Sequence, residues 1–412
     1  MNLPSFHTLL SPSGQSALAS AAELGPTEES FLSCLAKLKK KYPAELATAA
    51  LETAILRHKA RAKFSRADAM VFTRAGLEMA SGETISRYRA QRFAPLRQAQ
   101  GKLFARVADL CCGIGGDAIG LAHGVLAVDI DVLHLALAAA NLAAYDLRAD
   151  LIEADLTRTP PPPADAIWFD PARRAGGRRV FSVHGYQPPL DVIREWMKTA
   201  PALGAKISPG VKLSQLADYD CETEFISENG DLKECALWFG PLKTATRRAT
   251  LLSSHSSSIS LTAPPPHSHA ERPAPATSSP MNYLYEPDPA VMRAGLVTDL
   301  AAQIGAHQLD ADIAYLTSNS LTPTPFARPF AIEADMPFSQ KRLREKLRAM
   351  NVGRVTVKKR GSPLDPDDFA RSLRLKGDEE RILFLTHVQG KAWILIGTAV
   401  EAATEMQSTR SK

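Results

Sequence analysis

Four acidic residues, each predicted to follow a buried strand, are the side chains of this sequence best suited to binding a polar ligand. In open α/β sheets, ligands lie outside the carboxyl ends of the parallel strands. A single aspartate at such a place is as readily explained by a cap or a turn. Four of them around one crevice favour a binding site instead. They are Asp109, Asp129, Asp155 and Asp170.

A glycine loop follows the first of these acids. Residues 107–117 read Val-Ala-Asp-Leu-Cys-Cys-Gly-Ile-Gly-Gly-Asp. The apolar start predicts a buried parallel strand, the glycines allow positive φ angles and a close approach to a ligand, and Asp117 is placed to cap the next helix. Asp129 then follows the second strand, at the interval at which a carboxylate reaches ribose hydroxyls. The stretch predicts a nucleotide-like cofactor.

Two features favour S-adenosylmethionine over a dinucleotide. Asp109 precedes the glycines, where an acid would face a cationic methionine group but repel a pyrophosphate. The run Gly-Ile-Gly-Gly also departs from the G-x-G-x-x-G spacing of dinucleotide sites. We therefore assign Asp109, with Gly113 and Gly115, to the methionine portion. Asp129 is assigned to the ribose and Asp155 to the adenine amino group.

The elements that must position these residues alternate as in a doubly wound α/β domain over residues 101–252. Two segments around an Asn-Gly pair, 224–227 and 235–239, predict a β-hairpin at its end. The predicted strands are 107–110, 125–128, 149–152, 166–170 and 205–211, and the predicted helices are 118–123, 132–144 and 190–197.

Three further regions surround this domain. Leucines at helical spacing predict a helical N-terminal region over 1–100, with eight Lys and Arg residues between Lys37 and Lys63. Ser, Pro and Ala dominate 253–280, which predicts a flexible linker. Helical and strand patterns resume over 281–412 and predict a separate small α+β domain.

Clustered positive charge marks the last of these regions. Between Lys341 and Arg360 there are nine Lys or Arg residues and one acid, Glu345. Such clustering favours an RNA partner, although a basic surface that only meets solvent is the alternative. The same two interpretations apply to the basic N-terminal helices.

Composition narrows the class of protein. Over 412 residues, 45% hydrophobic and 23% charged positions are typical of a globular protein with two or three domains. The net charge is only +5, so an anionic partner requires clustered charge. Five cysteines without a CxxC pair, no leader-like start and no membrane-length apolar run predict a cytoplasmic protein. The histidines show no ligand spacing, so a metal is not an expected partner. A membrane is not an expected partner either, because no apolar run is long enough to span one.

Four stretches together resemble class I S-adenosylmethionine-dependent methyltransferases. Within that class the sequence is most similar to RNA guanine-N2 cap methyltransferases and to bacterial methyltransferases with a THUMP-like C-terminal domain. The resemblance implies a Rossmann-like fold, S-adenosylmethionine as cofactor and RNA as substrate. The stretches are 107–117, Ala-Val-Asp-Ile-Asp at 127–131, Glu-Ala-Asp at 153–155 and Phe-Asp-Pro-Ala at 169–172.

One departure from this family concerns the fourth strand. Relatives that methylate amines usually carry an acid, Ser or Asn, then Pro-Pro and an aromatic residue that stacks on the target base. Here Asp170 and Pro171 are followed by Ala and Arg. Asp170 can still accept a hydrogen bond from an amine or assist its deprotonation. Stacking must then come from Arg173, Trp168 or Phe181, or the target is not a base amine.

Basic residues near this motif are candidates for substrate binding. Arg173 and Arg174, with two more arginines at 178–179, suit a phosphate-bearing substrate, and a solvated loop is the alternative. Lys212 follows the next strand, where it can contact a phosphate or pair with Glu222 or Glu224. The sequence thus predicts a methyltransferase that acts on a base nitrogen in RNA, with Asp170 and Pro171 as catalytic residues. The alternatives are an inactive RNA-binding protein that keeps the cofactor fold and, less favoured, a nicotinamide-dependent oxidoreductase.

Overall fold

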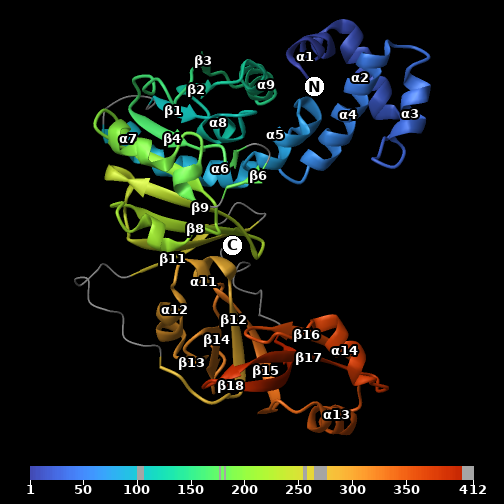
Figure 1. Cartoon of the computed structure of the whole chain (residues 1–412), viewed down its shortest axis with the longest axis vertical. Helices are drawn as coiled ribbons and strands as arrows, with labels where there is room; N and C mark the ends of the chain where they lie inside the picture. Colours follow the sequence, from blue (N-terminus) through green and yellow to red (C-terminus); the bar gives the residue numbers. More distant parts are fainter. Residues whose placement is uncertain (100–105, 176–177, 181, 254–257, 264–275, 401–412) are drawn as a thin grey trace, which may run out of the picture. The chain divides into compact units, whose positions relative to one another are not determined.

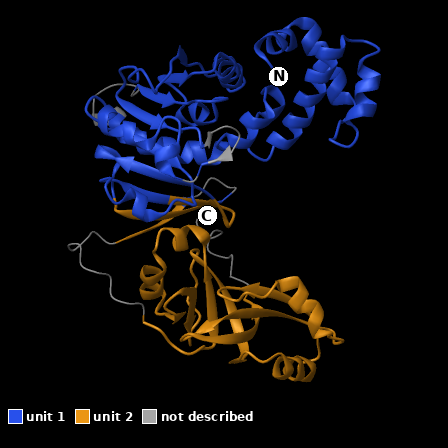
Figure 2. Ribbon diagram, viewed as in Figure 1, with its two compact units in different colours: residues 1–224, 233–244, 252–258 blue, residues 225–232, 245–251, 259–412 orange. Residues whose placement is uncertain are grey.

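The chain forms two compact units in the computed structural model (Figure 2). Unit 1 comprises residues 1–224, 233–244 and 252–258, and unit 2 comprises 225–232, 245–251 and 259–412. The described residues are 1–99, 106–175, 178–180, 182–253, 258–263 and 276–400. In the described part of the chain, no helix is both long and apolar enough to cross a membrane.

Helices make up the first hundred residues, as the leucine spacing predicts (Figure 1). Helix α2 packs against α4, and Ala17 and Ala21 on α2 and Ala50 on α4 are fully buried. The helices are α1 Leu3–Leu10, α2 Pro12–Glu23, α3 Phe31–Leu38, α4 Ala44–Ala60, α5 Arg74–Met79, α6 Glu83–Ala90 and α7 Ala94–Ala99.

This region is not a unit apart from the α/β domain. Helix α6 packs against α8 (Gly116–Leu121) so closely that a Cβ at Gly120 would lie 2.3 Å from the backbone carbon of Ser86. Both regions fall in unit 1, which differs from the expected boundary near residue 100. The amphipathic pattern predicted the helices. It did not predict which surface α6 covers, because that contact depends on Gly120 in α8.

Five parallel strands of unit 1 form the expected doubly wound sheet, in the order β3-β2-β1-β4-β7. The winding reverses between β1 and β4, and ligands of such sheets bind at that point. Helix α9 (Val132–Ala143) follows β2, and α10 (Ile193–Trp196) precedes β7. The strands are β1 Val107–Leu110, β2 Val125–Asp129, β3 Asp150–Glu153, β4 Ala166–Phe169 and β7 Leu203–Ile207.

The sheet continues with further strands, in the order β11-β10-β8-β9 beside β7. Asn229 and Gly230 both have positive φ angles and form the predicted hairpin turn. The linker expected over 253–280 is wrong for Ser258–Thr262, which forms β11; Ile and Leu alternate there with Ser and Thr, a pattern that suits a strand. The strands are β8 Glu222–Glu228, β9 Asp231–Phe239 and β10 Arg247–Leu252. The short strands β5 Arg174–Ala175 and β6 Arg178–Arg179, which follow β4 in the chain, form a separate two-stranded sheet.

The C-terminal part of unit 2 is the expected small α+β domain, built on a seven-stranded sheet. Its order is β13-β14-β12-β15-β18-β17-β16, and among the described strands of this sheet only β16 and β17 pair in parallel. The strands are β12 Tyr283–Pro287, β13 His307–Asp310, β14 Ile313–Ser318, β15 Ala327–Pro337, β16 Val352–Lys359, β17 Glu379–Val388 and β18 Lys391–Ala399.

Four helices accompany this sheet. The side chains of Asp288 and Ser339 cap two of them by accepting hydrogen bonds from first-turn amides. Leu343 and Leu347 on α13 and Phe369 on α14 pack into one core with the sheet. The outer face of α13 is thereby left to its charged residues. The helices are α11 Pro289–Arg293, α12 Val297–Ile304, α13 Gln340–Ala349 and α14 Pro366–Leu373.

Candidate functional site

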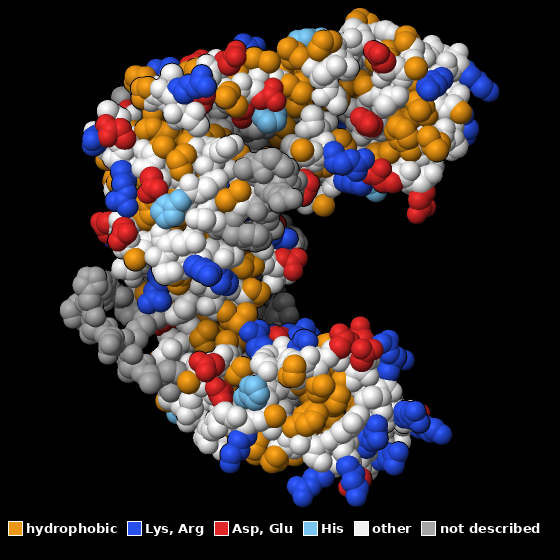
Figure 3. Space-filling model, in the orientation of Figure 1, with side chains coloured by type: hydrophobic (Ala, Val, Ile, Leu, Met, Phe, Trp, Pro, Cys, Tyr) orange, Lys and Arg blue, Asp and Glu red, His pale blue; other side chains and the backbone are white. Residues whose placement is uncertain are grey.

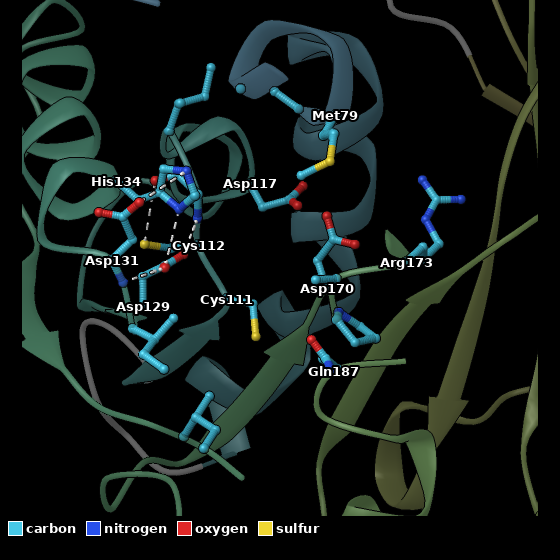
Figure 4. A pocket seen from close by; sticks show the side chains of 18 of the residues that line it. Met79, Cys111, Cys112, Asp117, Asp129, Asp131, His134, Asp170, Arg173 and Gln187 are labelled. Atoms are coloured by element: carbon cyan, nitrogen blue, oxygen red, sulfur yellow. Dashed lines mark hydrogen bonds and ion pairs between the residues drawn. The ribbon is translucent and has the colours of Figure 1, made fainter. Parts of the chain in front are cut away.

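A cavity of about 680 Å³ lies in unit 1 at the carboxyl ends of the parallel strands (Figure 4). Its volume is within the range of small-molecule and cofactor sites, which is roughly 300–1,000 Å³. The lining contains three of the four predicted strand-end acids and three more of the predicted site residues. These six are Asp129, Asp155, Asp170, Gly113, Pro171 and Arg173.

The glycine loop between β1 and α8 forms one wall. Gly113 has a φ of 53°, and a Cβ at this position would meet open space, so a ligand can approach the backbone here. Gly115, with a φ of 83°, does not line the cavity; a Cβ there would lie 3.1 Å from Cα of Ala138 on α9. Its predicted contact with the cofactor is replaced by close helix packing.

Asp117 is not the helix cap that its place after the glycines predicts. Gly115 occupies the N-cap position, and Asp117 lies in the first turn of α8. Its carboxylate lines the cavity and forms a buried ion pair with Arg89 on α6. The three glycines of this loop made the helix start ambiguous by one or two residues.

Asp129 organises the side of the cavity next to β2. Its Oδ2 accepts a hydrogen bond from the Gly113 amide at 2.9 Å, and its Oδ1 accepts one from the Asp131 amide at 3.0 Å. His134 on α9 adds a contact of 3.2 Å to Oδ1. A carboxylate oxygen has two acceptor positions, so Oδ2 keeps one for a ligand hydroxyl within the described structure.

The Asp129–His134 pair perturbs both groups. Burial alone would raise the pKa of Asp129, but the hydrogen bond from His134 and the two amides outweigh it and lower that pKa. The hydrogen bond to Asp129 raises the pKa of His134. Both shifts favour a carboxylate beside an imidazolium near neutral pH.

Asp155 follows β3 and also lines the cavity. Its Oδ1 accepts hydrogen bonds from the amide and the hydroxyl of Thr157, at 3.0 and 2.6 Å. The hydrogen bond from the Thr157 side chain lowers its pKa, followed by that from the Thr157 amide. Asp155 therefore both closes a turn and offers an ionised oxygen to the cavity.

Asp109 does not reach the cavity lining, which differs from its expected contact with the methionine portion. The side chain is fully buried, and neither carboxyl oxygen has a hydrogen-bond partner in the described structure. Burial, followed by the charges of Asp117 and Asp170, raises its pKa well above the usual range. Successive side chains of a strand alternate between the two faces of the sheet, so a residue near a strand end does not necessarily face the cavity. Asp109 lies instead in the buried charge cluster that includes Arg89.

Asp170 lies directly after β4, beside the end of β1. Its amide donates to the Leu110 carbonyl at 3.1 Å, which places the residue at the point where the sheet's winding reverses. Its carboxylate lines the cavity and accepts a hydrogen bond from Lys206 Nζ at 2.7 Å. Ala172 and Gln187 exchange two backbone hydrogen bonds of 3.0 Å and thereby hold the loop that begins with Pro171.

The predicted substrate-binding residues separate in space. Arg173 is half-buried and lines the cavity, whereas Lys212 is exposed and is not part of the lining. No ion pair of Lys212 with Glu222 or Glu224 is found in the described structure. Those carboxylates accept hydrogen bonds from other groups, including Arg92 and the Trp238 indole. The side chain of Arg174 lies outside the described residues.

The candidates for base stacking are likewise reduced. Trp168 is 2% exposed and packs between the guanidinium of Arg89 and the ring of Trp238, so it cannot face a ligand. Phe181 lies outside the described residues. Arg173 is the remaining member of the predicted set.

The N-terminal region supplies a wall of the cavity that the sequence did not predict. Residues 76 and 78–81 all belong to the lining, and we call segment 76–81 the roof. Met79 is 41% exposed and points toward the cavity in Figure 4. Lys63 holds the roof with hydrogen bonds to the carbonyls of Leu77 and Ala80, at 2.8 and 3.1 Å.

Lys206 and Ser81 are further residues that sequence reasoning missed. Lys206 is a lysine inside the apolar strand β7 and is 4% exposed. A charge in the middle of a buried strand was the available signal, because such a side chain requires a partner. Ser81 carried no signal, since small polar residues are frequent in loops.

Two cysteines line the cavity without the properties of a nucleophile. Burial, followed by nearby carboxylates, raises the pKa of both Cys111 and Cys112 well above the usual value. The thiolate is the reactive form of cysteine, so these thiols stay unreactive near neutral pH.

Family models match three parts of the chain. The THUMP domain-like family matches residues 327–399, which span β15 to β18. The RNA cap guanine-N2 methyltransferase family matches 104–159, which include the glycine loop, Asp129 and Asp155. A domain family of unknown function matches 2–60.

Close relatives occur in Mycobacterium tuberculosis. Proteins of strains CDC 1551 / Oshkosh and H37Rv, described as uncharacterized S-adenosylmethionine-dependent methyltransferases, are 33% identical over 352 residues. The match covers 82% of this chain and 92% of each relative. This chain belongs to the S-adenosylmethionine-dependent methyltransferases.

The methyltransferase shares its fold with a solved structure from Porphyromonas gingivalis W83 that is described as a candidate methyltransferase. The TM-score is 0.72 at 21% identity, and the match covers 94% of this chain and 99% of the other. The class I fold with a THUMP-like C-terminal domain, implied by the sequence resemblance, is confirmed.

The cavity fits the cofactor of this family, S-adenosylmethionine. Gly113 leaves room beside the backbone, and Asp129 keeps an acceptor position on Oδ2 within the described structure. Met79 and Ile130, both exposed apolar residues of the lining, provide surface for the uncharged parts of a nucleoside.

Substitution Asp129→Asn is expected to weaken S-adenosylmethionine binding about 10- to 100-fold, because a hydrogen bond to a charged acceptor contributes about 1.5–3 kcal/mol. Isothermal titration calorimetry measures the affinity. Asp150→Asn is the matched control. This exposed carboxylate is at the first residue of β3, the end of the strand remote from Asp155, and it pairs with Arg106. Equal affinities of the two variants would contradict the ribose assignment.

The Asp129–His134 pair predicts a pH-dependent contribution to stability. A raised histidine pKa stabilises the fold fully below the unfolded value, about 6.5, and the effect is lost as pH rises through the folded pKa. Urea titrations should therefore show a larger difference in unfolding free energy between wild type and His134→Gln near pH 6 than near pH 9. His58→Gln, at an exposed position on α4, is the control. A difference that grows with pH would be inconsistent with the pair.

Proposed function

We propose that this methyltransferase transfers the methyl group of S-adenosylmethionine to a base nitrogen in RNA. The observation that carries the proposal is the carboxylate of Asp170 in the cavity wall, followed by Pro171, at the point where the sheet's winding reverses. An acid followed by proline at this strand end resembles the motif of methyltransferases that act on amines. The match of 104–159 to the RNA cap guanine-N2 methyltransferase family supports the same class of substrate.

Within this proposal the cavity residues divide into two groups. Asp129 holds a ribose hydroxyl, Asp155 the adenine amino group and Gly113 the methionine portion. The bound cofactor supplies an electrophilic methyl group on a sulfonium. Asp170 accepts a hydrogen bond from the acceptor amine and thereby orients the lone pair of the amine nitrogen toward that methyl group. The Pro171 carbonyl faces the same amine, and Arg173 binds the phosphate or stacks on the base.

Orientation is the main contribution asked of these residues. A carboxylate acceptor aligns the amine and stabilises the positive charge that develops on its nitrogen. The proton then leaves the methylated nitrogen to Asp170 or to solvent. Little further acid–base chemistry is needed, because the cofactor already carries an activated methyl group.

The proposed RNA partner is supported by a basic surface on the C-terminal domain. Four exposed cations on α13 have no ion-pair partner among the described residues: Lys341, Arg342, Lys346 and Arg348. Figure 3 shows Lys and Arg side chains gathered over this end of the domain. Other cations of the 341–360 cluster are engaged, as Arg354 is with Glu380 and Lys358 with Glu286. The charge of α13 is therefore available for phosphates.

Substitution Asp170→Asn is expected to lower the rate of methyl transfer by at least about 100-fold, since the amide cannot take up charge or a proton. The measurement is the transfer of labelled methyl from S-adenosylmethionine to total small RNA. S-adenosylmethionine binding, followed by calorimetry, should persist in the variant. Cofactor binding by the wild type without transfer to RNA would instead support a binding protein that keeps the cofactor fold.

Replacement of the four α13 cations by Gln is expected to weaken RNA binding about equally for different sequences. The slope of log affinity against log salt should fall by roughly one for each phosphate that the helix no longer neutralises. Filter binding across a salt series measures both. Gln replacement of Arg354, Arg371 and Arg381, all paired with acids, is the matched control. Equal salt slopes for the two variants would rule out α13 as the RNA surface.

A further inference from the structure

Lys206 is a buried cation in contact with the proposed catalytic carboxylate. It lies in β7, the strand beside β4, and its side chain is 5% exposed. Its ammonium group donates to Asp170 Oδ2 at 2.7 Å and to Ser81 Oγ at 2.9 Å. Lysine is rarely buried, because the loss of hydration must be offset by charged partners and hydrogen bonds. Its presence inside β7 therefore requires an explanation.

The ion pair with Lys206 leaves one oxygen of Asp170 toward the cavity. Only Oδ2 takes part in the ion pair, and the other oxygen accepts no hydrogen bond from any described residue. The Asp170 side chain is 21% exposed and belongs to the cavity lining. Lys206 thus fixes the rotation of the carboxylate while Oδ1 stays available to a ligand.

Further carboxyl groups surround this pair. Asp109 on β1, Asp117 on α8 and Glu234 on β9 are buried and act electrostatically on one another or on Asp170. Arg89, also a buried cation, pairs with Asp117 and Glu234 and not with Asp170. Among the described residues, Lys206 is therefore the cation in direct contact with Asp170. Without it, Asp170 would stand among three further carboxyl groups and lose its ion pair.

We propose that Lys206 is the positioning residue of the methyltransferase reaction, holding Asp170 Oδ2 so that Oδ1 points at the acceptor nitrogen. The inference rests on the proposed function, because it assigns the acceptor interaction to Asp170. It also gives the roof a role, since Ser81 shares the same ammonium group. The N-terminal segment and the catalytic loop are thereby held by one side chain.

Lys63 offers a matched control for the role of Lys206. It too is a lysine that holds the roof, through the carbonyls of Leu77 and Ala80, but it does not touch Asp170. Lys63→Met therefore loosens the roof alone. Lys206→Met loosens the roof and releases the carboxylate.

The test compares these variants in the transfer of labelled methyl to total small RNA. Lys206→Met is expected to lower kcat about 100-fold, the reduction typical of a misplaced reacting group, and to raise KM for S-adenosylmethionine no more than Lys63→Met does. Lys63→Met is expected to raise KM for S-adenosylmethionine with little change in kcat. In the Asp170→Asn background, Lys206→Met should cause no further decrease, whereas Lys63→Met should keep its own effect.

Three results would overturn the assignment. They are equal decreases of kcat in the two lysine variants, an unchanged kcat in Lys206→Met, or a full additional decrease in the Asp170→Asn background. Thermal unfolding verifies that each variant folds; if Lys206→Met does not, Ser81→Ala removes the second partner of Lys206 and should lower kcat with the same non-additivity. Absence of transfer by the wild type would overturn the proposed function itself, a result distinct from transfer with unaffected Lys206 variants.

Discussion

Buried charge at the carboxyl ends of β1 and β4 is the constraint on which the catalytic unit depends. Four carboxyl groups, those of Asp109, Asp117, Asp170 and Glu234, surround the cations of Arg89 and Lys206. Charges removed from water are tolerated only where they are paired. Arg89 belongs to α6, so the cluster requires the N-terminal helices to pack on the α/β sheet. The two regions therefore form one unit.

The same packing builds the cavity. Glycines at 115, 116 and 120 let α8 approach α9, the roof and α6 at distances that a Cβ would block. The roof then covers the crevice where the winding of the sheet reverses, and Lys63 anchors it from the side of α4. The cavity is therefore lined by the glycine loop and by roof residues, which are the surfaces proposed to hold the cofactor. Exclusion of water by such a wall strengthens the electrostatic interactions inside the site.

The same packing decides whether Trp168, close to the Asp-Pro-Ala-Arg motif, can face the cavity. Trp168, which precedes the motif by two residues, is occupied by Arg89 and Trp238 in the core. The apolar surface of the cavity comes instead from aliphatic and thioether side chains, among them Met79 of the roof. In the proposed function, the acceptor is held by orientation more than by stacking. The fixed carboxylate of Asp170 is consistent with that emphasis.

The sequence by itself determined the parts whose signals are local. Apolar runs, the glycine loop and the Asn-Gly turn predicted the strands, the helices and the doubly wound α/β domain. The resemblance to known methyltransferases implied the class I fold, and the strand-end acids indicated the cavity. Tertiary structure alone decided which acids face that cavity. Asp109 is buried beneath it, Asp117 lines it from inside α8, and Lys206 reaches Asp170 across a strand pair. The physical reason is that burial and pairing of charge depend on residues over a hundred positions apart, such as Arg89 and Glu234, which no local pattern records.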